Sequence, residues 1–83
     1  MRISLRYFAS IREALGSGDA VEVEHGLTLG GLRDRLIARD EPHAQALARG
    51  RALRVALNQS LADESAALAD GDEVAFFPPV TGG

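Results

Sequence analysis

The chain has 83 residues, which suits one small domain, and its 46% hydrophobic and 25% charged content is ordinary for a globular protein. Nine basic and twelve acidic residues give a net charge of −3, which argues against nucleic acid or an anionic membrane as the main partner. The lack of cysteine excludes disulfides, iron–sulfur clusters, thiolate zinc sites and a cysteine nucleophile. No run of residues is apolar and long enough to span a bilayer or act as a secretory signal, so we expect a cytoplasmic protein.

The first predicted element is a strand over Arg2–Phe8, because apolar and polar residues alternate there. Phe8 interrupts its polar face. Ser10 is the predicted N-cap of a short helix over Ile11–Leu15, which Gly16 ends.

A second alternating strand is predicted over Ala20–Glu24. Thr28 is the predicted N-cap of the main helix, whose apolar stripe recurs at spacings of three and four residues and comprises Leu29, Leu32, Leu36 and Ile37. The sequence from Asp40 to Pro42 ends this helix, because proline disfavours helical geometry in the preceding residue. Pro42 also suits the first turn of another short helix, running to Ala48.

Alternation resumes over Leu53–Leu57, which predicts a third strand turned by Asn58–Ser60. Residues 61–68 show no clear period, and we expect them to be irregular. Asp70–Asp72 is a strong turn signal, and the last strand is predicted over Glu73–Phe77.

This order of elements predicts an α+β fold, with a mixed sheet and the main helix packed across one face. If the first and last strands pair side by side, they are central and parallel. Phe8 and Phe77 then lie near each other on the face away from the helix. Two large apolar side chains on a polar face indicate a binding patch, although they can also simply cover each other.

The residues after the last strand form an unusual tail. Pro78 and Pro79 cannot extend a sheet and stiffen an extended exit, whereas Gly82 and Gly83 fit a channel too narrow for side chains. Extended, the six residues reach roughly 20 Å, enough to carry a carboxylate into another protein's active site. Composition alone equally permits a frayed end.

The body of the chain carries no motif for catalysis. The absence of lysine excludes a P-loop, and His25 and His43 lack metal-ligand spacing, so we expect no metal site. There is also no Gly-x-Ser-x-Gly elbow for a serine nucleophile. We therefore expect no active site within the body of the chain.

Residues 70–83, which read DGDEVAFFPPVTGG, together with residues 8–13 and 57–59, resemble the small-subunit family of molybdopterin synthase. The similarity runs from end to end of the chain. It implies a ubiquitin-like β-grasp fold, with a domain over residues 1–77 and an extended tail over residues 78–83.

The resemblance also implies a function as a sulfur carrier that is not itself catalytic. An adenylyltransferase partner activates the carboxylate of Gly83 with ATP, and sulfur then replaces one oxygen to give a thiocarboxylate. The tail enters the large catalytic subunit and donates its sulfur to a pterin precursor, which forms the dithiolene of molybdopterin. The family acts as a heterotetramer of two small and two large subunits, and the small subunit binds no cofactor of its own.

The family's functional positions carry over to specific residues of this chain. Gly83 bears the sulfur, and Gly82 is its slender neighbour. The residues that match the family's contacts with the large subunit are Phe8, Leu61, Phe77, Pro78, Pro79, Val80 and Thr81.

Three other functions remain open at this point. Carriers of the thiamin pathway share the fold and the Gly-Gly end, but they are typically shorter and lack the Phe-Phe-Pro-Pro run. A ubiquitin-like modifier would join Gly83 to lysines of other proteins, although this chain has no lysine through which to link to itself. A plain interaction domain with an inert tail would tolerate the loss of Gly83.

Overall fold

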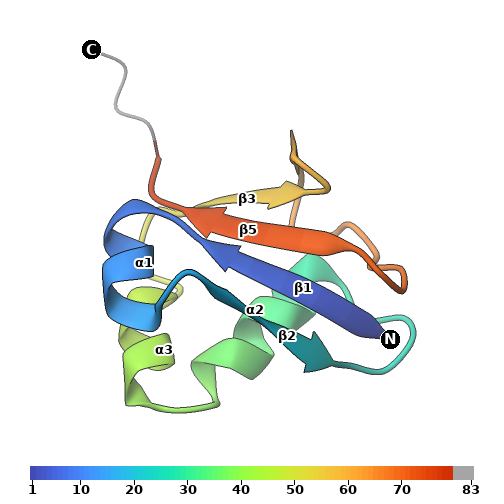
Figure 1. The fold of residues 1–83 in the computed structure, drawn as a ribbon, viewed down its shortest axis with the longest axis horizontal. Helices are drawn as coiled ribbons and strands as arrows, with labels where there is room; N and C mark the ends of the chain where they lie inside the picture. The colour runs from blue at the N-terminus through green and yellow to red at the C-terminus, as the bar shows by residue number, and fades with distance from the viewer. Residues whose placement is uncertain (80–83) are drawn as a thin grey trace.

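The computed structural model describes residues 1–79, which form a mixed sheet covered by helices on one face (Figure 1). Within this range the elements are, in chain order, β1 (Arg2–Tyr7), α1 (Ala9–Leu15), β2 (Gly18–Glu22), α2 (Leu29–Ile37), α3 (Glu41–Ala46), β3 (Arg54–Leu57), β4 (Ser60–Leu61) and β5 (Glu73–Phe77). None of the described helices is long and apolar enough to cross a membrane.

The strand order is β2-β1-β5-β3-β4, so the first and last strands lie side by side in the middle of the sheet. They are parallel, with Leu5 opposite Val74 and Tyr7 opposite Phe76, whereas the other pairs are antiparallel. The predicted α+β class and central parallel pair are confirmed. This strand order, with the helices on one face, is that of the ubiquitin-like β-grasp that the resemblance implies.

The core lies between the sheet and the helices, because alternate strand residues point toward them. Ile3, Leu5 and Tyr7 are buried on β1, while the residues between them are exposed. The helical stripe packs against this layer, and the predicted positions Leu29, Leu32 and Leu36 are buried. The largest fully buried side chains are Tyr7, Phe76, Ile3, Leu29, Leu32, Leu47 and Val74.

The predicted start of α2 is confirmed, because the Thr28 hydroxyl accepts a 3.1 Å hydrogen bond from the backbone N–H of Gly31. The predicted start of α1 is wrong. The helix begins at Ala9 with Phe8 at the N-cap, no side chain caps it, and Ser10 lies inside the helix. Ala9 has a φ of 53°, so the backbone turns sharply between Phe8 and the rest of the helix.

The predicted turn after β3 is confirmed, and a short strand follows it where the region expected to be irregular begins. Asn58 and Gln59 have φ values of 50° and 71°, the pattern of a two-residue hairpin turn, and the short strand β4 follows. The Asn58 side chain donates to Asp72 at 3.0 Å and accepts from the backbone N–H of Glu73 at 2.9 Å. The hairpin is therefore fastened to the start of β5.

Arg33 is the one charged side chain among the described residues that is buried, with 4% of its surface exposed. Its guanidinium donates to the carbonyl oxygens of Leu47 and Ala48 at 2.8 and 2.7 Å and to the Glu64 carboxylate at 2.8 Å. Arg49 also binds Glu64. Arg33 therefore joins α2 to two loops that lie far from it in the sequence.

Candidate partner-binding face and tail root

The face of the sheet opposite the helices, called the open face here, is built around two small residues. Ala56 on β3 lies opposite Ala75 on β5, and Ala56 also lies opposite Leu61 on β4. Both alanines are nearly buried, whereas Leu61 is 68% exposed. Because the side chains in the middle of the face are small, the exposed side chain of Leu61 projects beyond them at the edge of the face.

Phe8 and Phe77 lie where β1 and β5 end. The backbone N–H of Phe8 donates to the carbonyl oxygen of Phe76 at 3.2 Å, which extends the parallel pairing by one residue. Phe77 is paired with Arg54 and, by alternation from buried Phe76, belongs to the open face. Phe8 is 37% exposed and Phe77 is half-buried. The structure thus brings both predicted aromatics to the same end of the central strand pair.

Arg6 flanks this end of the open face. Its guanidinium carbon lies 5.2 Å from the centre of the Phe8 ring, a cation–π geometry, and it reaches the Glu73 carboxylate at 3.7 Å. A charged group therefore borders the aromatic side chain, and the open face combines apolar side chains with a polar edge, as protein interfaces do.

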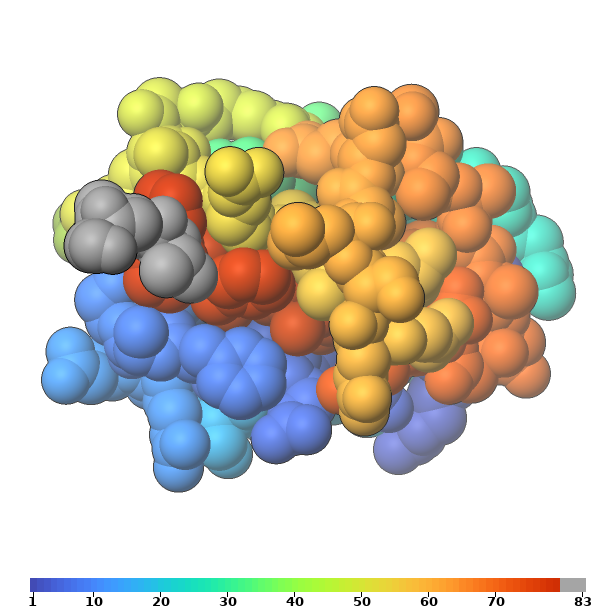
Figure 2. All heavy atoms as spheres, turned by 90° about the horizontal axis from the view of Figure 1, so that it is seen from above, coloured from blue at the N-terminus to red at the C-terminus, as the bar shows by residue number. Residues whose placement is uncertain are grey.

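The tail begins directly at this end of the sheet. Figure 2 shows the red end of the central strand β5 between the blue N-terminal segment and the yellow segment that leads into β3. Pro78 and Pro79 follow Phe77 and are half-buried. The predicted site residues Val80, Thr81, Gly82 and Gly83 lie outside the described residues.

The sequence did not indicate the roles of Ala56 and Ala75. Their alternation with buried neighbours marks them as open-face residues, but alanine is common in strands and helices alike. Pairing across the sheet makes them adjacent, and that pairing joins residues about twenty positions apart. Leu61 was identified by resemblance alone, since β4 is too short to show a period.

Among the described residues there is no group of three histidine, cysteine, aspartate or glutamate side chains that could hold a metal ion. Burial raises the pKa of Tyr7 from its ordinary value near 10 to about 12, but its ring is packed in the core against Phe76 and His43. The chemical interest of the described part therefore lies in its surface rather than in a pocket of reactive groups.

Comparison with known proteins places this arrangement in a family. The model of the ThiS family matches residues 5–83. A molybdopterin synthase sulfur carrier subunit of Escherichia coli is 46% identical over 98% of this chain and 99% of its own. Small archaeal modifier protein 3 of Haloferax volcanii is 36% identical over all of both chains.

A solved structure gives the same fold together with a partner. It is a protein–protein complex of subunits 1 and 2 of a molybdopterin-converting factor from Helicobacter pylori, with a TM-score of 0.71 and 30% identity over all of both chains. Because the family model covers nearly all of the chain, the chain belongs to the ThiS family.

Proposed function

We propose that this protein is the sulfur-carrier subunit of a molybdopterin synthase. The observation that carries the proposal is the adjacency of β1 and β5, which brings Phe8 and Phe77 to the point where the tail leaves the sheet. Full-length similarity to a sulfur carrier subunit at 46% identity supports the same conclusion. A partner that binds the open face is thereby positioned to receive the tail.

The chemistry belongs to the carboxylate of Gly83. An adenylyltransferase joins it to the AMP portion of ATP with release of pyrophosphate, which turns an unreactive carboxylate into an acyl-adenylate. A sulfur nucleophile then displaces AMP and leaves a thiocarboxylate. Gly82 and Gly83 have no side chains, so two successive enzymes can each enclose the reacting carbon.

The sulfur acceptor is a pterin precursor held by the large catalytic subunit. Phe8, Leu61 and Phe77 supply the apolar contacts on the open face, and Pro78 to Thr81 connect them to the reacting end. In the Helicobacter pylori complex the related chain is bound to a second subunit. We infer a heterotetramer of two small and two large subunits in the cytoplasm, with ATP consumed by the adenylyltransferase and no cofactor held by this chain.

The test is the intact mass of the protein after incubation with its adenylyltransferase, ATP and a sulfur source. We expect a gain equal to the exchange of one oxygen for one sulfur, localised to the C-terminal peptide. A variant extended by one alanine after Gly83 is the matched control and should stay unmodified while folding normally. An unchanged mass with an active adenylyltransferase would contradict the proposal.

A second candidate is a ubiquitin-like protein modifier, which the similarity to small archaeal modifier protein 3 favours. Both functions use an activated Gly83, so the mass test alone does not separate them. A modifier forms isopeptide bonds with lysines of other proteins, whereas a carrier restores molybdopterin synthesis when mixed with the large subunit. Conjugates that depend on Gly83 without any such restoration would favour the modifier.

A further inference from the structure

The arginines of this chain divide into two groups. Six of them form ion pairs with acidic side chains, namely Arg2, Arg6, Arg33, Arg35, Arg39 and Arg49. The other three, Arg12, Arg51 and Arg54, are exposed and pair with no carboxylate in the part of the chain that the structure describes. Arg12 occupies the last turn of α1, where the helix C-terminus favours a positive charge. Arg51 and Arg54 have no such internal explanation.

Arg54 lies beside the root of the tail, and Arg51 lies in a cleft next to the segment that follows Phe8. Arg54 begins β3 and is opposite Phe77, the last residue of β5, so its side chain shares the open face with that ring. Arg51 precedes β3 by three residues and lines one end of a cleft of about 520 Å³ between α1 and α3. Arg54 therefore borders the end of β5 from which the tail leaves, and Arg51 lies in the neighbouring cleft that Ser10 and Ile11 also line.

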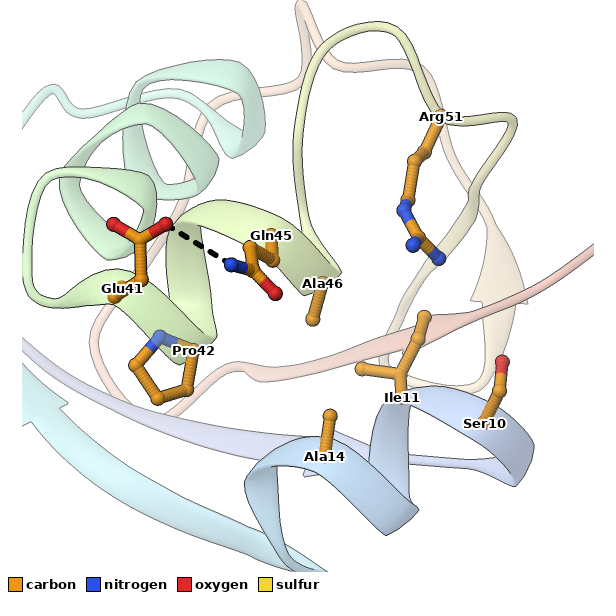
Figure 3. Close-up of a pocket in the computed structure, with 8 residues that line it drawn as sticks. All are labelled: Ser10, Ile11, Ala14, Glu41, Pro42, Gln45, Ala46 and Arg51. Atoms are coloured by element: carbon orange, nitrogen blue, oxygen red, sulfur yellow. Dashed lines mark hydrogen bonds between the residues drawn. The ribbon is translucent and has the colours of Figure 1, made fainter.

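The lining of the cleft contains one acidic residue, Glu41, as well as Arg51. Figure 3 shows Arg51 with Ser10 and Ile11 at one end and Glu41 at the other. The Glu41 carboxylate accepts a 3.0 Å hydrogen bond from Gln45, within α3. Glu41 forms no ion pair with Arg51, which lies at the other end of the cleft.

The loop that contains Arg51 is held in place by hydrogen bonds from Arg33 and within the loop itself. The buried guanidinium of Arg33, which binds the carbonyl oxygens of Leu47 and Ala48, also lies 3.5 Å from the carbonyl oxygen of Arg51. The backbone N–H of Arg51 donates to the carbonyl oxygen of Ala48 at 2.9 Å. The Arg51 backbone is therefore fixed although its side chain is exposed. A fixed backbone lowers the conformational entropy lost when a partner binds this loop, although the exposed Arg51 side chain must still be ordered.

The charge is also unevenly distributed along β5. Asp70, Asp72 and Glu73 lie at its start, whereas Arg54 lies opposite its last residue, in a chain whose net charge is −3. Such an arrangement orients an approaching molecule before contact, so that the end of the sheet that bears the tail meets a negative surface first.

Resting on the proposed function, we propose that Arg51 and Arg54 dock onto acidic side chains of the large subunit, at the rim of the channel that receives the tail. The site is continuous with Phe8 and Phe77, so the same partner contacts both. A nucleic acid is a poor alternative, because two arginines in an acidic protein give too little charge for it.

The test compares association rates with the large subunit of the same organism at low and high ionic strength. Arg51→Gln combined with Arg54→Gln should slow association by about 5–10-fold at low salt, and the rates should converge with wild type as salt rises. Arg2→Gln combined with Arg35→Gln is the matched control, since it removes the same charge from exposed arginines elsewhere and should change the rate by less than about twofold. Circular dichroism and thermal melts verify that every variant folds.

Each other outcome overturns the proposal. Equal slowing of both double variants would assign the effect to net charge, and no slowing of either would remove Arg51 and Arg54 from recognition. If wild type itself failed to bind the large subunit, the proposed function would fall and this inference with it, a result distinct from normal wild-type binding with unaffected variants.

Discussion

The backbone N–H of Phe8 lies 3.2 Å from the carbonyl oxygen of Phe76, so the last bond between the two central strands is made where the aromatic end of the open face begins. Phe8 is consequently held beside the strand whose next residue is Phe77. The position of the aromatic pair depends on pairing between the two ends of the chain and not on any local motif.

Replacing Phe8 or Phe77 with alanine should weaken binding of the large subunit by about 2 kcal/mol, because each ring is expected to be an anchor that becomes buried at the interface. Isothermal titration with the large subunit measures the change. Glu22→Ala, on the edge strand β2, is the control and should leave the affinity within experimental error. A variant of Phe77 that binds as tightly as wild type would exclude this ring from the interface.

Asn58 should stabilise the protein through its backbone conformation and through its side chain. Asn58→Ala should lower the free energy of unfolding by about 2 kcal/mol, since alanine tolerates φ of 50° poorly and both bonds to the start of β5 are lost. Asn58→Gly should cost about half as much, because glycine accepts the conformation but not the bonds. Denaturant unfolding gives both values.

Gln59→Gly tests the same turn without touching a bond that the structure shows. Its φ of 71° also suits glycine, so this variant should be as stable as wild type or slightly more so.

For Asn58, equal destabilisation by the glycine and alanine variants would show that the backbone strain assigned to this position is wrong.

The Arg33–Glu64 pair should contribute to stability in a pH-dependent way. Glu64 is partly desolvated, which acts to raise its pKa, but hydrogen bonds from Arg49 and Arg33 outweigh this and lower it. The stabilisation is therefore present at neutral pH and is lost as the pH falls through the lowered pKa of Glu64. Glu64→Ala should cost about 2–3 kcal/mol at pH 7, because it leaves buried Arg33 without its carboxylate.

The control for this change is Arg2→Ala, which breaks the exposed Arg2–Glu22 pair at 3.8 Å and should cost less than about 0.5 kcal/mol. Urea unfolding between pH 3 and pH 7 separates the two variants in the range where carboxylates titrate. A Glu64→Ala loss that does not shrink toward acid pH would contradict the assignment to an ion pair.

Tyr7 should make the protein sensitive to alkali. Its pKa of about 12 lies above its ordinary value near 10, so the folded state holds the proton more tightly, and stability falls as pH rises from about 10 toward 12. Its hydroxyl has no hydrogen-bond partner among the described residues. Tyr7→Phe should therefore gain about 1 kcal/mol and lose this dependence.

The titration of Tyr7 can be followed in this chain with little interference from other groups. Tyr7 is the single tyrosine, and the chain contains neither lysine nor cysteine, so few other groups titrate in that range. In the folded protein, tyrosinate absorbance should appear only at a pH well above 10. In denaturant, the same absorbance should appear near pH 10. Coincident titrations in the two states would contradict a burial effect.

The sequence predicted the strands because alternation is a direct consequence of a half-buried sheet, and it predicted Thr28 because a cap is a local interaction. Sequence reasoning misplaced the start of α1, because an alanine in the sequence gives no indication that its φ is positive. It assigned β2 to Ala20–Glu24 rather than Gly18–Glu22, because the glycine at its start hides the pattern.

Arg33 shows most clearly what sequence reasoning missed. It follows a stripe residue on an amphipathic helix, where an arginine is normally solvated. Its burial depends on carbonyl oxygens and a carboxylate 14, 15 and 31 positions away.

The candidate aromatic site was predictable because Phe8 and Phe77 break a polar face. The arginines beside it, in contrast, become distinctive only when every ion pair is known.

The central position of β5 has a consequence for synthesis on the ribosome. The middle of the sheet stays vacant until residues 73–77 have emerged, because β1 has no neighbour on that side and β3 has nothing to pair with across the gap. The nascent protein therefore exposes the edges of β1 and β3 and much of its core until β5 arrives. Closure of the sheet and formation of the aromatic face at the tail root become one event, so activating enzymes would meet that face only on chains that have already folded.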